Sequence, residues 1–145
     1  MANNRTLTTA NAIIIMNVPG VITGHQVQGF SADDIFDFET VQRAEILMGL
    51  DGQQAGGYTP QSTKWTINLA ANSESNDAFD AWISSQNAEK EIFTAEYIIT
   101  SKSLGKTAYM HRGILESAQP FASFKKTAQP RPFVISFESV EVHDL

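Results

Sequence analysis

The chain has 145 residues, of which 42% are hydrophobic and 18% charged, and it contains no cysteine. This composition fits one folded domain spanning residues 1–145, and it excludes a disordered chain, a disulfide framework, a thiolate metal site and a cysteine nucleophile. The net charge of −6 is opposite in sign to that of most proteins that bind nucleic acid tightly. The longest apolar run, residues 12–16, is far shorter than the ~20 residues of a membrane span, so we expect neither a signal peptide nor membrane insertion.

The first third of the chain is predicted to consist of a polar arm followed by strands. Residues 1–11 are rich in Asn and Thr and are expected to form a mobile arm. Pro19 and Gly20 form a turn signal, and Gly24 and Gly29 indicate a bend of the kind seen in small barrels. Apolar and β-branched residues predict strands over residues 12–18, 21–30, 34–38 and 41–48.

The segment from Leu50 to Ser62 differs from its surroundings because it is rich in glycine and poor in apolar residues. It is predicted to be a long loop or an extended hairpin. Long loops in compact domains are usually functional or disordered. The candidate contact residues for a partner in this segment are Leu50, Asp51, Gly52, Gln53, Gln54, Gly56, Gly57, Tyr58, Thr59 and Pro60.

One helix is predicted, from about Asn76 to about Lys90. Ser73 or Ser75 is a candidate N-cap, and acidic residues follow in the first turns, where the helix dipole favours negative charge. One apolar stripe recurs at helical spacing and contains Ala78, Phe79, Trp82 and Ile83.

The remaining segments are predicted to be strands at residues 64–71, 93–101, 107–117 and 133–142, with a basic loop at 121–131. The cleanest alternation places Trp65, Ile67 and Leu69 on one face. The large aromatic residues are interpreted as core rather than as a ligand pocket, because their spacing matches the secondary structure. They are Trp65, Phe79, Trp82 and the residues of 133–137.

Charge is distributed unevenly along the chain. The charged residues of 33–51 are nearly all acidic, and the charged residues of 102–131 are nearly all basic. Two interpretations stay open: the segments are solvated faces of a monomer, or the acidic face of one copy meets the basic face of the next, which would set orientation and encounter rate. The candidate acids are Asp33, Asp34, Asp37 and Glu39, and the candidate basic interface consists of Lys125, Lys126 and Arg131.

No motif predicts catalysis, a metal or a cofactor. Gly105-Lys106-Thr107 lacks the earlier glycine of a phosphate-binding loop, and a strand pattern follows it. The three histidines are separated in sequence and lack zinc-site spacing. The acidic cluster is more typical of a solvated strand than of a cation site. We therefore expect a structural or binding protein and not an enzyme, with sheet edges that invite pairing between copies.

Two stretches carry a resemblance to a known family. The run AEILMGLDGQQAGGYTP at residues 44–60, and the run WTINLAANS at 65–73 followed by Asn76 and Asp77, resemble the tail tube proteins of tailed bacteriophages. The order of predicted elements is similar as well. The resemblance implies a mainly β fold, either a small β-barrel or a two-sheet sandwich, with one flanking α-helix and a long loop.

The resemblance also implies an assembly. Members of that family form rings, typically hexameric, that stack into a hollow tail tube in the virion and are assembled in the host cytoplasm. Residues 50–62 would reach the neighbouring subunit or the next ring, and partners would include the sheath, tape-measure and baseplate proteins. DNA would pass through the channel without specific binding, which suits an acidic lumen because like charges repel.

Several alternatives follow from the same sequence. The candidate acids would either line the lumen or meet the candidate basic residues of a neighbouring subunit. The protein itself would otherwise be the inner tube subunit of a phage-like contractile injection or bacteriocin particle, or a tail-completion or adaptor protein. A β-barrel ligand-binding module or an enzyme of an unrecognised type is the alternative from a different class.

Overall fold

A computed structural model describes residues 12–29, 36–102 and 104–145. The predictions made for the arm at residues 1–11 and for Asp33 and Asp34 therefore lie outside the described residues.

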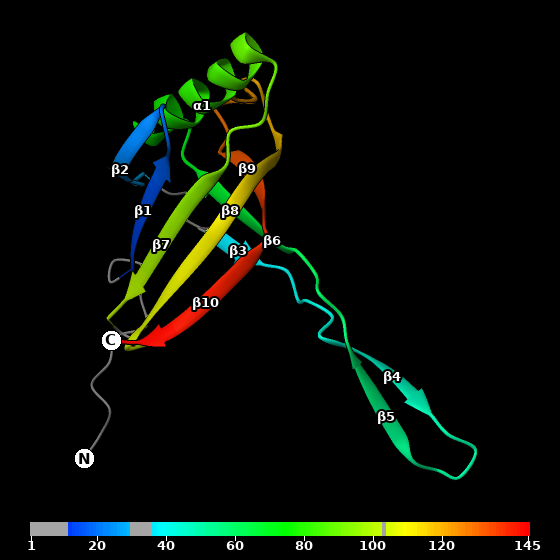
Figure 1. The fold of residues 1–145 in the computed structure, drawn as a ribbon. Helices are drawn as coiled ribbons and strands as arrows, with labels where there is room; N and C mark the ends of the chain where they lie inside the picture. Colours follow the sequence, from blue (N-terminus) through cyan, green and yellow to red (C-terminus); the bar gives the residue numbers. More distant parts are fainter. Residues whose placement is uncertain (1–11, 30–35, 103) are drawn as a thin grey trace.

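The described part of the chain is mainly β structure with one helix (Figure 1). In chain order the elements are β1 (Ala12–Val18), β2 (Ile22–Gln26), β3 (Phe36–Phe38), β4 (Ala44–Met48), β5 (Gln54–Tyr58), β6 (Thr63–Leu69), α1 (Ser75–Glu89), β7 (Ala95–Ser101), β8 (Lys106–Ala118), β9 (Arg131–Phe137) and β10 (Ser139–Asp144).

The main sheet is antiparallel and open. Its strand order is β2-β1-β7-β8-β9-β6-β3. Strand β10 is an additional strand outside this order and pairs with β8. The long β8 joins two layers, because residues 106–111 pair with β10 while residues 114–118 pair with β9. Among the described residues β2 and β3 end the sheet without pairing with each other, so the sandwich alternative holds and the barrel does not close.

Gly113 of β8 packs so closely against the core that it has no room for a side chain. A Cβ atom added to Gly113 would lie 2.5 Å from Cε1 of Phe137 and 3.0 Å from Cγ2 of Ile135. No other residue fits this position without moving its neighbours. Between β9 and β10, Glu138 interrupts the strand that the sequence predicts as continuous, and its N–H donates to the carbonyl of His111 at 3.1 Å.

Aromatic rings from the two layers form the centre of the core. The Trp65 ring lies 5.1 Å from Tyr97 and 5.9 Å from Phe137, centroid to centroid, and all three side chains are buried. The Trp65–Tyr97 pair is edge-on, and ring pairs of this kind contribute beyond their buried area. The prediction that Trp65, Phe79, Trp82 and the inward residues of β9 form the core is confirmed.

Helix α1 covers one end of the sandwich through the predicted stripe. Phe79 stacks on Phe133 of β9 at 4.3 Å, and the Trp82 indole N–H donates to the Phe93 carbonyl at 2.8 Å. Ala78 and Ile83 pack partly buried against the same cluster.

The start of α1 differs from the prediction. The N-cap residue is Glu74, without a side-chain cap, rather than Ser73 or Ser75. The Ser73 hydroxyl nevertheless accepts the Ser75 N–H at 3.2 Å, so it satisfies one donor at this helix end. The chain reaches the helix through a tight loop in which Ser73 also bonds to the Gln28 carbonyl.

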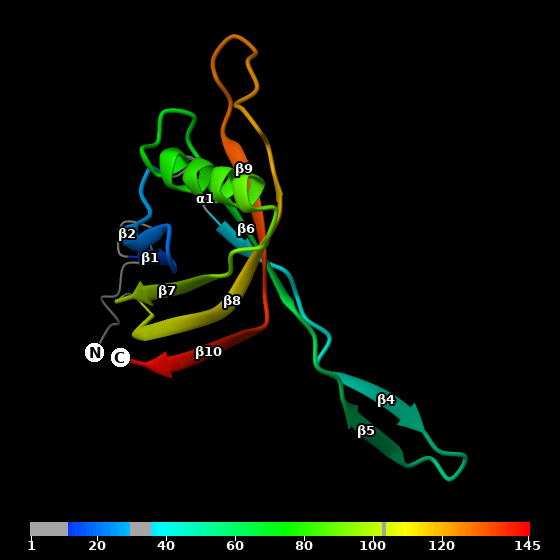
Figure 2. The same ribbon diagram turned by 45° about the horizontal axis from the view of Figure 1, so that its top comes forward.

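The glycine-rich segment takes the second of the two predicted forms, an extended hairpin. Strands β4 and β5 form a separate two-stranded sheet that projects from the body as an arm (Figures 1 and 2). The predicted segment from Leu50 to Ser62 therefore contains the whole of strand β5, and the arm begins at Ala44, six residues before Leu50.

Candidate assembly surfaces

The arm, residues 44–58, holds its shape through its own hydrogen bonds. At its turn Gly49 donates to the Gln53 carbonyl at 2.8 Å, and Asp51 accepts from the Gln53 N–H at 3.0 Å. Gly52 has φ +83°, a conformation that glycine adopts without strain. The turn therefore needs no support from the body of the protein.

The two faces of the arm differ in chemistry. Directly opposed residues of antiparallel strands lie on one face, and the register pairs Ala44 with Tyr58 and Ile46 with Gly56. Ile46 and Tyr58 thus share one mostly apolar face with Met48. Glu45 and Leu47 lie on the other face, opposite Gly57 and Ala55.

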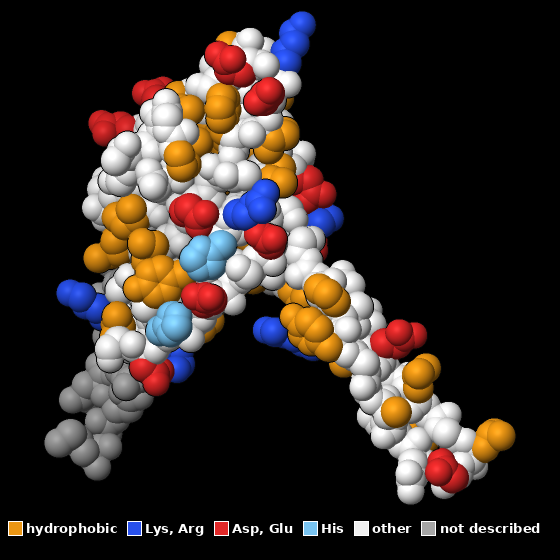
Figure 3. Space-filling view, in the orientation of Figure 1, with side chains coloured by type: hydrophobic (Ala, Val, Ile, Leu, Met, Phe, Trp, Pro, Cys, Tyr) orange, Lys and Arg blue, Asp and Glu red, His pale blue; other side chains and the backbone are white. Residues whose placement is uncertain are grey.

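Every residue of the arm is exposed. Ile46 is 63% exposed, Met48 65% and Tyr58 85%, and Leu50 at the turn is completely exposed. Figure 3 shows that hydrophobic side chains occur along the arm. An isolated two-stranded hairpin is only marginally stable in water, and exposed apolar side chains gathered in this way are typical of interaction surfaces.

The backbone edges of the arm are also open. Gly49 bonds to Gln53 and Thr59 bonds to Arg43, so odd-numbered residues make the hydrogen-bonded pairs of the hairpin. The N–H and C=O groups of Ile46 and Gly56 therefore point outward from the two edges. Such edges can add a strand from another chain.

The described candidate acids lie at the base of the arm. Asp37 is exposed on the short edge strand β3, between Phe36 and Phe38, which turn inward to Trp65. Glu39 follows it and lines an open polar hollow where the arm leaves the body, beside Lys64. The two acids are therefore neighbours on the outer surface, and neither has an ion-pair partner among the described residues.

The candidate basic residues divide into two groups. Lys125 and Lys126 are exposed on the connection between β8 and β9. Arg131 lies inside the protein with a side chain that is 6% exposed, so it has no free surface to offer a neighbour. It bonds to both carboxylate oxygens of Asp80 at 2.9 and 3.3 Å and lies 5.0 Å from the Phe133 ring, which ties α1 to β9.

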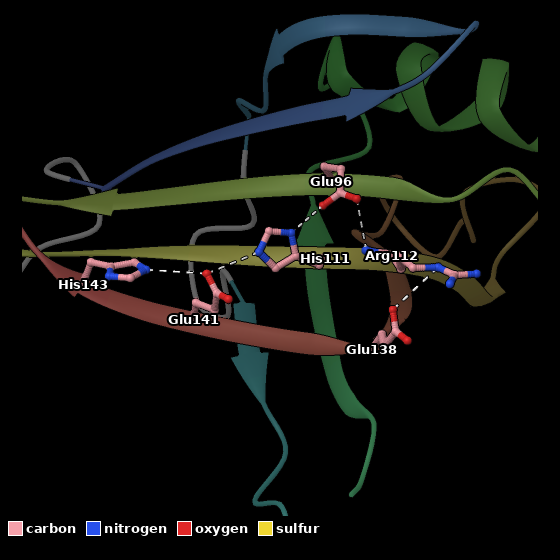
Figure 4. Close-up of polar contacts among 6 residues, drawn as sticks. All are labelled: Glu96, His111, Arg112, Glu138, Glu141 and His143. Atoms are coloured by element: carbon pink, nitrogen blue, oxygen red, sulfur yellow. Dashed lines mark hydrogen bonds and ion pairs between the residues drawn. The ribbon is translucent and has the colours of Figure 1, made fainter.

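Folding brings together two histidines that are separate in sequence (Figure 4). His111 on β8 and His143 on β10 each lie 3.6 Å from Glu141, and His111 also bonds to Glu96 at 3.0 Å. Sequence reasoning missed this network because the β8–β10 register that creates it has no sequence signature. These side chains are about half exposed, so each pair contributes little to stability.

The described residues contain no candidate metal site and no helix that could span a membrane. None of their His, Asp and Glu groups has a geometry that could hold a metal ion. Their one helix is too short and too polar to cross a membrane.

Solved structures share this fold over nearly their whole length. The tube-terminating cap of the anti-feeding prophage matches with a TM-score of 0.63 at 13% identity, covering 100% of this chain and 95% of that one. The sheath/tube terminator of an extracellular contractile injection system, PVC, matches at 0.60 and 14% identity, covering 98% and 99%. A chain of the PVC sheath-tube complex matches at 0.58 and 13%, covering 98% and 94%.

The fold is thus the one found in chains of these tube-and-sheath particles. Residues 5–141 match the family described as tail fiber protein gp32, and the chain belongs to that family. No curated protein matches the sequence significantly. The expectation that the chain belongs to a phage tail family is confirmed. The family description names a fiber and not a tube, so the expectation of a tube protein is not confirmed.

Proposed function

We propose that this protein is a ring-forming structural subunit of the tube of a phage-like tail. The observation that carries the proposal is the projecting arm. It exposes apolar side chains and two open strand edges on a hairpin that contributes nothing to the core of its own chain. Such an element gains its stability from a neighbouring subunit.

A tube-like role is favoured over a fiber shaft by the form of the chain. Elongated single-chain architectures are built from repeats, because each unit buries its apolar face only against the next unit. This sequence has no internal repeat, and the fold is one sandwich around one core with a flanking helix. Structures titled as tube terminators and a sheath-tube complex cover it almost completely.

The proposed assembly is a ring, typically hexameric, that stacks along a channel. Asp37 and Glu39 then lie either on the lumen, where their charge repels DNA phosphates, or against a neighbouring subunit. The proposed partners are other copies of the chain together with sheath, tape-measure and baseplate proteins. The protein acts as a structural component of the tail particle, assembled in the host cytoplasm, and it has no catalytic role.

A terminal ring that caps the tube is a second candidate. It is favoured by the two matched structures whose titles name a tube-terminating cap and a sheath/tube terminator. A tube subunit adds further rings, whereas a terminator stops after one. Electron microscopy of purified assemblies therefore separates the two: stacked tubes support the subunit and single rings support the terminator.

The proposal is tested by shortening the arm. The Thr59 N–H donates to the Arg43 carbonyl at the base of the hairpin, so a two-residue Asn-Gly turn can replace residues 44–58 without moving the body. We expect the unfolding temperature to stay close to that of the wild type and assembly, measured by sedimentation velocity, to be lost. A shortened protein that assembles like the wild type contradicts the proposed role of the arm.

A further inference from the structure

We propose that the arm of one copy docks on the loop between β8 and β9, residues 119–130, of the next copy. This inference rests on the proposed function and names the surface that receives the arm. Below, these residues are called the β8–β9 loop.

The β8–β9 loop is an exposed aromatic and basic surface. Phe121 is 75% exposed and Phe124 67%, and their rings lie 6.2 Å apart. Lys125 and Lys126 follow directly, and no acidic residue occurs from residue 117 to residue 130. Two neighbouring exposed phenylalanines beside two cations mark a surface suited to an apolar partner with negative charge.

The β8–β9 loop is also ordered before any partner binds. Its backbone folds back on itself, with Gln129 donating to the Ser123 carbonyl at 2.7 Å and Lys125 donating to the Thr127 carbonyl at 3.1 Å. A bridge between Phe124 and Ala128 closes the same turn. A surface held in place in this way loses little conformational entropy when it binds.

The arm has the complementary composition. Its only charged residues are Glu45 and Asp51, which give it a charge of −2 against the +2 of the loop. Leu50 stands fully exposed at the turn beside Asp51. An apolar tip with an adjacent carboxylate thus matches an aromatic pair with adjacent ammonium groups.

The positions of the two surfaces favour contact between copies. The arm extends from one end of the body, while the β8–β9 loop, orange in Figures 1 and 2, lies at the opposite end beside α1. The two surfaces therefore do not meet within one chain. A contact between different surfaces of identical copies leaves one arm and one loop free, and it propagates until the assembly closes into a ring or forms a filament.

The other broad surface suits the arm less well. The outer face of β7, β8 and β10 carries Glu96, Glu138 and Glu141 around the histidine network, with one arginine, Arg112, 3.6 Å from Glu138, so that carboxylates outnumber the arginine (Figures 3 and 4). These carboxylates would lie against the acids of the arm, and like charges at an interface disfavour the contact.

Cysteine cross-linking tests the docking directly, because the natural chain has no cysteine. Protein carrying Leu50→Cys at the arm turn is mixed with protein carrying Ser123→Cys in the β8–β9 loop, and a short bis-maleimide is added. The matched control carries Ser139→Cys, an exposed serine on β10. We expect cross-linked dimers from the Ser123 mixture and not from the Ser139 mixture.

The outcomes separate this inference from the proposed function. Assembled protein that cross-links through Ser139→Cys, or through neither site, overturns the docking on the β8–β9 loop and leaves ring formation intact. A wild-type protein that stays monomeric at millimolar concentration overturns both.

Charge reversal supplies a second readout. Lys125→Glu with Lys126→Glu should raise the concentration needed for assembly about tenfold, because two exposed ion pairs are replaced by repulsion. The complementary change in the arm is Gln53→Lys with Gln54→Lys, which leaves the turn hydrogen bond of Asp51 in place, and this arm reversal should then restore assembly. The control Lys102→Glu, outside the β8–β9 loop, should leave it unchanged. Failure of the arm reversal to rescue the loop reversal contradicts the pairing.

Discussion

Trp65 and Trp82 are equally buried but differ in their hydrogen bonds. The Trp82 indole N–H donates to the Phe93 carbonyl, whereas the buried Trp65 N–H has no partner among the described residues. Both changes to Phe leave a void, but only Trp82→Phe leaves a carbonyl unpaired. We therefore expect Trp82→Phe to cost about 1–3 kcal/mol more than Trp65→Phe in urea unfolding. Equal losses in the free energy of unfolding for the two variants would show that the Trp82 hydrogen bond does not stabilise the fold.

Because Tyr97 is buried, we predict that the folded protein loses stability against unfolding at alkaline pH. Burial raises the pKa of Tyr97 well above the usual value, and its hydroxyl lies 2.9 Å from the Met16 sulfur. In the unfolded chain a tyrosine ionises near pH 10, while folded Tyr97 stays neutral. The contribution of the neutral Tyr97 side chain to the free energy of unfolding is therefore complete below about pH 10. This contribution is lost as the pH rises toward the pKa that Tyr97 has in the folded protein.

Thermal unfolding of wild type and Tyr97→Phe across the alkaline range tests this expectation. The variant lacks the ionising hydroxyl, so its unfolding temperature should fall less steeply above about pH 10. Parallel curves for the two proteins would show that Tyr97 ionises equally easily in both states.

At the residue scale, alternation and helical spacing predicted the core, while long-range polar pairs were not predictable. Trp65 and Phe79 were identified because their period matches a strand and a helix. The sequence places Arg131 in the candidate basic interface, yet its side chain is buried against Asp80, which lies 51 residues earlier. No local pattern indicates which distant carboxylate an arginine will meet.

At the scale of elements, the two faces of the arm give a matched pair of variants. Ile46 and Leu47 are 63% and 62% exposed but lie on opposite faces. We expect Ile46→Thr to weaken assembly more than Leu47→Thr, because Ile46 belongs to the face that also carries Met48 and Tyr58. Neither should change the free energy of unfolding by more than ~0.5 kcal/mol, as expected for exposed sites.

Sedimentation velocity and urea unfolding of both variants check this prediction. A larger assembly defect from Leu47→Thr would place the contact on the other face of the arm. A large loss of folding stability from either variant would show that the arm packs on the body.

The arm also shows where element prediction from sequence ends. The β-branched strand β1 and the alternating strand β6 are predicted from the sequence to within about two residues at each end. Strand β5 contains Gly56 and Gly57 and therefore has no alternation to recognise. The sequence left a loop and a hairpin as equal alternatives, and only the pairing with β4 decides between them.

At the scale of the whole molecule, the sequence does not determine whether the strands close into a barrel or form a sandwich. Sequence pattern predicts strands and their inward faces, but a barrel and a sandwich contain the same strands. The difference lies in the irregularity of β8 at Arg112, where φ is +51° and the register with β7 shifts, and in the end strands β2 and β3, which stay unpaired with each other in the described structure. Both depend on the three-dimensional path of the chain and not on any one segment.

The central claim is that this fold forms rings around a channel, with the arm as the contact between copies. Negative-stain electron microscopy of the purified wild-type protein, with class averaging of the particles, tests it most directly. The proposed function predicts rings with a central channel, alone or stacked into tubes, and none for the protein with the shortened arm. Solid fibers without a channel, or particles of monomer size only, would contradict it.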